Sequence, residues 1–136
     1  MQQISLNATQ SIIFDTGLLK HLTGIGNSAV LLKSDYQFKG PLTENFILQE
    51  LKDQFLVPPH FFADKNSEID FIIQSGTEII PVEVKGGKEK SAASFKAYIK
   101  HKQPKTAIRF SKLGYATSGA ITNLPLYLAG MAKDLI

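Results

Sequence analysis

The chain has 136 residues, of which 43% are hydrophobic and 20% charged, with a net charge of +3 and no cysteine. These values are typical of one globular domain with a single core, and they exclude a disordered chain, a disulfide scaffold and cysteine-based chemistry. No apolar run approaches the roughly 20 residues that span a bilayer, and the first residues lack the basic-then-apolar pattern expected of a signal peptide. We therefore expect a cytoplasmic protein with no membrane partner, whose mild positive charge permits contact with nucleic acid.

The amino-terminal part of the chain predicts a short capped helix. Residues 1–10 are polar, and we expect them to form a loose lead-in to a single domain over residues 11–136. Residues 11–14 suit a short strand or an extended segment. Asp15 is a good N-cap for a helix that runs through Leu22, and capping is favoured over a role of this carboxylate in a site.

A second helix is predicted to begin at Gly40-Pro41, with proline at its favoured first position, and to reach about Phe55. Its apolar stripe consists of Ile47, Leu48, Leu51 and Phe55. Glu44 continues that stripe, where a carboxylate is costly unless it is paired, protonated or bound to a cation. Two interpretations follow: Glu44 complements the helix dipole from the first turn, or it belongs to a functional site.

Two β-forming runs in the middle of the chain predict a hairpin. Residues 68–73 and 78–85 are rich in β-branched and aromatic side chains, and a turn containing Ser75-Gly76 separates them. We expect a loop of two or four residues that pairs Ile73 with Glu78. Side chains alternate along a strand, so one face of the first strand is predicted to hold Ile69, Phe71 and Ile73.

The predicted register gathers three charged side chains on the other face. It pairs Asp70 with Pro81, which makes Glu83 a diagonal neighbour of Asp70 at about 7 Å or less. Lys85 lies on the same face as Glu83. A slip of one residue would scatter the three charges, so the cluster depends on the register.

This cluster has a chemical interpretation and a structural one. Two neighbouring carboxylates suit Mg²⁺ or Mn²⁺, and such an ion polarises a phosphoryl oxygen and lowers the pKa of a bound water. Lys85 would hold the attacking water or neutralise charge on the phosphate. The alternative is a solvated, charged hairpin face. The spacing alone favours this alternative, because Asp-x12-Glu-x-Lys is short enough to recur by chance.

The remaining segments complete the predicted fold. Pro58-Pro59 is expected to break the preceding helix, and residues 61–63 to form a strand. Further strands are expected over residues 106–110 and 120–122, before a final helix that opens at Leu124-Pro125. The apolar face of this helix is predicted to contain Leu126, Leu128 and Met131. The order of elements predicts an α/β fold with a central mixed sheet flanked by helices.

The densest basic stretch falls on a predicted helix. Ser91 is a plausible N-cap, and the helix is expected to run through Lys102. Lys96 and Lys100 lie on or near its outer side, with further lysines before and after the helix. The stretch is able to follow a phosphate backbone, and a solvated lysine-rich face is the alternative.

Five ordered motifs, found at residues 14–19, 42–46, 68–71, 81–85 and 122–127, together resemble a known group of proteins. Their arrangement is similar to that of the restriction-endonuclease-like PD-(D/E)xK superfamily. More closely, they resemble the uncharacterised domain at the C-terminal end of many bacterial and archaeal AAA-type ATPases. The proline that names the superfamily motif is absent, because Ile69 stands before Asp70.

The resemblance implies a restriction-endonuclease-like core and roles for matching residues. Asp70 and Glu83 would be metal ligands, with the carbonyl of Val84 as a third. Lys85 would serve the nucleophilic water, and Glu44 would support this metal or a second one.

The resemblance also extends to the helix that follows the hairpin. Ser94 occupies the position of a polar helper, and with Lys96 and Lys100 it would contact nucleic acid.

Three functional hypotheses follow. The first is a metal-dependent nuclease that uses Mg²⁺ or Mn²⁺ to hydrolyse DNA phosphodiester bonds, normally in association with an AAA-type ATPase. The second is a non-catalytic module with a nuclease fold that docks nucleic acid or protein beside an ATPase. The third is a structural domain whose charged hairpin face serves self-association. The sequence has no phosphate loop of the Gly-x4-Gly-Lys-Ser/Thr type, so we do not expect these residues to bind ATP in that way. The resemblance implies an AAA-type ATPase as a partner.

Overall fold

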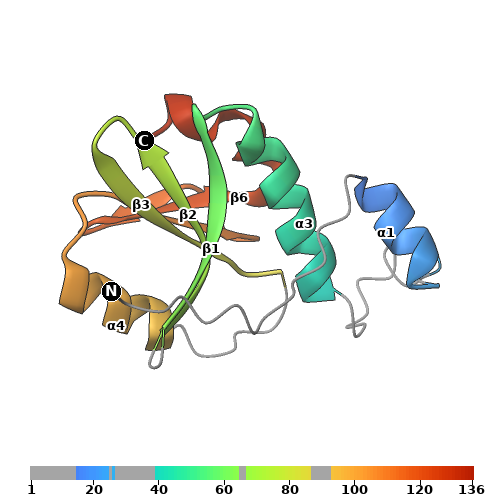
Figure 1. Ribbon diagram of the computed structural model, residues 1–136, viewed down its shortest axis with the longest axis horizontal. Helices are drawn as coiled ribbons and strands as arrows, with labels where there is room; N and C mark the ends of the chain where they lie inside the picture. The colour runs from blue at the N-terminus through green and yellow to red at the C-terminus, as the bar shows by residue number, and fades with distance from the viewer. Residues whose placement is uncertain (1–14, 25, 27–38, 65–66, 87–92) are drawn as a thin grey trace, which may run out of the picture.

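The computed structural model describes residues 15–24, 26, 39–64, 67–86 and 93–136 (Figure 1). The expected lead-in and strand before Asp15, and the expected cap at Ser91, lie outside these residues. The helices and strands of the described residues are, in chain order, α1 (Thr16–Leu22), α3 (Lys39–Lys52), β1 (Val57–Asp64), β2 (Ser67–Ser75), β3 (Glu78–Val84), α4 (Ala93–Lys102), β4 (Ala107–Ser111), β5 (Ala116–Ser118), β6 (Ile121–Pro125) and the 3₁₀ helix η1 (Leu126–Asp134). No helix among the described residues has the length and apolar character needed to cross a membrane.

The fold is α/β, as predicted, and is built on one mixed six-stranded sheet in the order β1-β2-β3-β4-β6-β5. Strands β1, β2 and β3 are antiparallel neighbours, while β3, β4 and β6 run parallel to one another. Helix α4 forms the crossover between β3 and β4, as parallel pairing requires. The carboxyl ends of β3, β4 and β6 therefore meet at the same edge of the sheet.

Each face of the sheet carries its own apolar cluster. Helices α3 and η1 cover one face, where the largest buried side chains include Ile47, Leu51, Phe71 and Phe110. Helix α4 covers the other face with Phe95 and Tyr98 (Figure 1). The predicted stripe of the second helix is confirmed, because all four of its apolar residues lie in the first cluster.

The hairpin register differs from the predicted one by two residues. Ser75, rather than Ile73, pairs with Glu78, so the loop contains only Gly76 and Thr77. Gly76 has a φ of +61°, and glycine with positive φ at the first of two loop positions is typical of a type II′ hairpin turn. A shift of two residues keeps every side chain on its predicted side of β3, because the strand repeat is also two.

A bulge in β2 changes one predicted face. His60 pairs with Ile72 and Phe62 with Ile69, so β2 advances three residues where β1 advances two. Ile69 consequently belongs to the cluster beneath α4, whereas Phe71 belongs to the cluster beneath α3. The predicted common face of these two residues was therefore wrong, because a bulge reverses the alternation at the extra residue.

Two boundaries before the hairpin were also misplaced. Helix α3 ends at Lys52, although the buried Phe55 beyond it still packs in the core. Pro58-Pro59 does not interrupt the fold but lies within β1. This strand is at the edge of the sheet, where the missing N–H of proline is tolerated.

The carboxyl-terminal elements depart most from prediction. Strand β6 extends to Pro125, so Leu124-Pro125 is part of the sheet, and β5 was not predicted. The final helix is 3₁₀, which has three residues per turn. The residues on its core side are Leu126, Ala129, Ala132 and Leu135. Met131 is therefore 53% exposed, and its predicted place in the core was wrong because the helical period is three.

Helix α1 is capped as predicted, because Oδ1 of Asp15 accepts a hydrogen bond from the N–H of Leu18 at 2.6 Å. It contacts α3 through polar side chains. The hydroxyl of Thr16 donates to Gln49 at 3.0 Å and accepts from the amide of Asn45 at 3.2 Å. No residue of α1 is buried, so this helix adds little to the core.

Candidate active site

Asp70 and Glu83 lie side by side on adjacent strands. Phe71 and Val82 form the register pair farthest from the turn between β2 and β3. One further step in this register places Asp70 beside Glu83. The predicted diagonal relation therefore becomes a direct one. Asp70 also falls in the β2 bulge, a feature that often redirects side chains next to active sites.

The carboxylate of Asp70 is anchored by backbone rather than by a cation. Its Oδ2 accepts a hydrogen bond from the N–H of Val84 at 2.6 Å. Within the described part of the chain, it forms no ion pair. Burial raises the pKa of Asp70 above its ordinary value of 3.8, and the charge of Glu83 adds to this effect. The Val84 hydrogen bond and the charge of Lys85 oppose it.

Glu83 is 6% exposed, and each of its oxygens contacts a different cation. The ammonium of Lys85 lies 2.8 Å from Oε1, and Nε of Arg109 lies 3.1 Å from Oε2. Arg109 is the register partner of Glu83 across the parallel β3–β4 pair. Together with Asp70, these residues form a charge cluster of two carboxylates and two cations, with no net formal charge when all are ionised.

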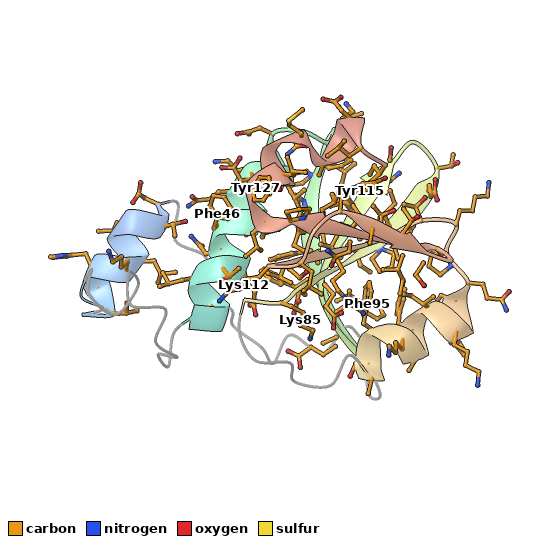
Figure 2. The ribbon with its side chains drawn as sticks, turned by 180° about the vertical axis from the view of Figure 1, so that it is seen from behind. Phe46, Lys85, Phe95, Lys112, Tyr115 and Tyr127 are labelled. Atoms are coloured by element: carbon orange, nitrogen blue, oxygen red, sulfur yellow. The ribbon has the colours of Figure 1, made fainter. Side chains whose placement is uncertain are left out.

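Lys85 follows β3 at the carboxyl edge of the sheet, and its N–H donates to the carbonyl of Phe110 at 2.8 Å. Figure 2 shows Lys85 between the ends of α3 and α4. The next residue, Gly86, packs tightly against α3. A Cβ at this position would lie 2.5 Å from the hydroxyl oxygen of Thr43. The first turns of α3 are therefore pressed against the strand end that carries Lys85.

Glu44 lies in these first turns of α3 but does not complete a three-carboxylate site. It is half-buried, and its Oε1 lies over the start of the helix, 3.9 Å from where a Cβ on Gly40 would be. Among the described residues, no group of three or more His, Cys, Asp or Glu side chains is arranged to hold a metal ion. The structure thus brings together Asp70, Glu83 and Lys85, and the expected metal-supporting role of Glu44 stays a prediction.

The residues predicted to contact nucleic acid lie on α4. Lys96 and Lys100 are exposed, and Ser94 is half-buried directly before the buried Phe95. The two lysine side chains are therefore accessible to a polyanion in solution.

Arg109 is a site residue that the sequence interpretation missed. Its guanidinium lies 5.8 Å from the centroid of the Phe95 ring, so α4 packs over it. Its Nη2 atom is shielded from solvent and has no hydrogen-bond partner among the residues that the structure describes. A sequence signal exists, because Arg109 interrupts a strand whose other residues are buried, and a charge in such a strand needs a partner.

A row of polar side chains crosses the sheet from β3 through β4 to β6. Glu83 pairs with Arg109, and Arg109 pairs with Asn123 on β6. The row ends in a hydrogen-bonded pair, because the hydroxyl of Ser111 donates to Oδ1 of Asn123 at 2.8 Å. The amide of Asn123 in turn donates to the carbonyl of Gly114 at 2.8 Å, which fixes the loop after β4. The candidate site is thus one end of a polar strip across four strands.

A family comparison covers all of these residues. Residues 39–128 match the family described as a domain of unknown function, DUF4143, and this segment is well over half of the chain. The chain belongs to the DUF4143 family. No curated protein and no solved structure matches it significantly.

The DUF4143 segment begins with the first residue of α3 and ends within η1. It therefore contains the entire sheet and the charge cluster, while α1 precedes it. The family description assigns no activity.

The donor atoms at this DUF4143 site suit a single divalent cation. Asp70 presents a half-buried carboxylate with no cationic partner in the described chain, and the oxygens of Glu83 lie beside it. Hard carboxylate oxygens are the ligands that Mg²⁺ and Mn²⁺ prefer, and Mg²⁺ is commonly held by one or two carboxylates with substrate phosphates. A cation at this position would compete with Lys85 and Arg109 for Glu83.

Proposed function

We propose that the DUF4143 domain of this chain is a metal-dependent nuclease that hydrolyses the phosphodiester bonds of DNA. The proposed location of this activity is the cytoplasm. The observation that supports this proposal is the convergence of Asp70, Glu83 and Lys85 at one end of the β2–β3 hairpin. The five-motif resemblance to the PD-(D/E)xK superfamily supports the same function. An AAA-type ATPase is the proposed partner, on the strength of that resemblance alone.

Each residue of the cluster has a distinct part in this proposal. Asp70 and Glu83, with the carbonyl of Val84, would hold Mg²⁺ or Mn²⁺. When bound, such an ion supplies Lewis-acid polarisation of the phosphoryl oxygen and a bound water of lowered pKa. The ammonium of Lys85, once released from Glu83, orients the attacking water or neutralises charge that develops on the phosphate.

The long-range contacts would come from the outer side of α4. The exposed Lys96 and Lys100 neutralise phosphates of the DNA backbone, and Ser94 offers a hydroxyl nearer the sheet. These contacts position the backbone but carry no sequence information.

The test is a cleavage assay on the purified chain. Single- and double-stranded DNA are incubated with Mg²⁺, with Mn²⁺ and with chelator, and Glu83→Ala is prepared in parallel as the control for contaminating nuclease. Metal-dependent cleavage that is lost in Glu83→Ala and in Lys85→Ala is the expected result. Cleavage that is unchanged in Glu83→Ala would overturn the mechanism.

A second candidate function is a docking module that binds nucleic acid or an ATPase without cleavage. The observation that favours it is that both oxygens of Glu83 already contact protein cations. The cluster is therefore charge-balanced without a metal. This function predicts that Lys85→Ala retains partner binding, and that the chain cleaves neither form of DNA with any metal.

A further inference from the structure

Arg109 places a permanent positive charge inside the sheet. Its neighbours Ala107, Ile108 and Phe110 are fully buried, so the guanidinium emerges from a strand whose other residues are buried. A guanidinium stays protonated at any ordinary pH, unlike an amine or an imidazole. Its charge therefore acts on Glu83 whether or not another ligand is bound.

The two cations on Glu83 are held with different firmness. Lys85 lies just beyond β3, and its ammonium is a compact charge on a flexible stem. Arg109 lies within β4, paired on both sides by β3 and β6, and its guanidinium is covered by Phe95. Lys85 is thus able to leave Oε1, while Arg109 continues to hold Oε2.

We infer that Arg109 is a positioning residue that fixes the orientation of Glu83 and keeps the affinity of the site for free divalent cations low. This inference rests on the proposed function, since it concerns the same carboxylates. With Arg109 in place, the two carboxylates leave little net negative charge to attract a dication. A phosphate group restores the missing negative charge, so cation and nucleic acid bind together rather than one after the other.

The experiment measures Mn²⁺ binding to the full chain by calorimetry, without nucleic acid. Arg109→Gln removes the charge, Arg109→Lys keeps it, and Arg109→Met keeps an unbranched stem beneath Phe95. We expect Arg109→Gln and Arg109→Met to bind Mn²⁺ at least about tenfold more tightly than the wild type. The reason is that a unit positive charge a few ångströms from a dication repels it strongly inside a protein. Arg109→Lys stays near the wild type, and adding Asp70→Asn to Arg109→Gln abolishes the gain.

Circular dichroism establishes that each variant is folded, and the two neutral variants provide independent readings of the charge effect. Equal or weaker Mn²⁺ binding by both neutral variants would overturn the inference, as would the absence of binding in every protein. Binding by the neutral variants alone supports it. The nuclease proposal is decided separately by the cleavage assay with Glu83→Ala, so the two are able to fail independently.

Discussion

The backbone N–H of Val84 donates a hydrogen bond of 2.6 Å to Oδ2 of Asp70. This bond crosses from β3 to the bulge in β2, so the strand that carries one carboxylate of the cluster also fixes the other. The held carboxylate is half-buried, and burial raises its pKa above 3.8. The protonated form of Asp70 is therefore favoured in the folded chain relative to the unfolded chain.

Asp70→Asn is expected to stabilise the fold at neutral pH. Asp70 keeps its proton to a higher pH in the folded wild type than in the unfolded chain. Its contribution to stability is therefore fully present below pH 3.8 and is lost as the pH rises through the raised pKa. Asparagine keeps an acceptor for Val84 without carrying the charge. Urea denaturation over this pH range should show an advantage of the variant that shrinks as the solution is acidified. A difference in stability that does not change with pH would contradict the assignment.

Glu83→Gln should be more damaging than Lys85→Gln. The first change leaves Arg109 without its charge partner in a buried strand, and we expect a loss of about 2–4 kcal/mol, somewhat less than for a fully buried pair. The second removes a cation from the end of the strand and should cost about 1 kcal/mol or less. Chemical denaturation of both variants tests the ranking, and equal losses would show that Arg109 does not depend on Glu83.

Gly86→Ala is predicted to destabilise the chain by about 1–3 kcal/mol, because the new methyl group would overlap Thr43. Gly114 provides a matched control, since a Cβ there would have no neighbour within 4 Å in the described part of the chain. Gly114→Ala should be neutral or slightly stabilising. Adding Thr43→Ala to Gly86→Ala should recover part of the loss, as thermal unfolding would show. If both glycine variants behave alike, the contact between α3 and the strand end is looser than described.

The lysines of α4 lead to a prediction about salt. If the chain binds DNA through this helix, the double variant Lys96→Ala and Lys100→Ala should weaken binding and reduce the slope of log affinity against log salt by about 1.8, or about 0.9 for each phosphate contact. Lys133→Ala on η1, across the sheet, should leave the slope unchanged. Fluorescence anisotropy with labelled DNA at several salt concentrations measures both quantities. If the salt slope of the double variant equals that of the wild type, DNA binds to a surface other than α4.

Local chemistry in the sequence was enough to predict the elements that depend on near neighbours. The cap by Asp15 and the β2–β3 hairpin were both confirmed, because each is decided within a few residues. The register of the hairpin was missed by two residues. Gln74 and Ser75 are polar and were interpreted as part of the turn, but they continue the strand and leave only Gly76-Thr77 as the loop.

Features that depend on distant pairing were not predictable in this way. The contact between Glu83 and Arg109 arises from parallel pairing across the α4 crossover, and no local pattern determines that register. The period of η1 was likewise hidden, because its small core residues, Ala129 and Ala132, carry no strong hydrophobic signal. The candidate site was therefore predicted from Glu44, Asp70, Glu83 and Lys85, and Arg109 was missed.

The crossover also has a consequence for the order in which the chain folds. The β2–β3 hairpin is local and brings Asp70 beside Glu83, two like charges that oppose its pairing at that end. Lys85 offsets one of them, and the second positive charge arrives only when β4 has docked beyond α4, a contact of long sequence separation. The turn end of the hairpin is thus free to form early, while the end that carries the carboxylates closes late on folding and opens first on unfolding.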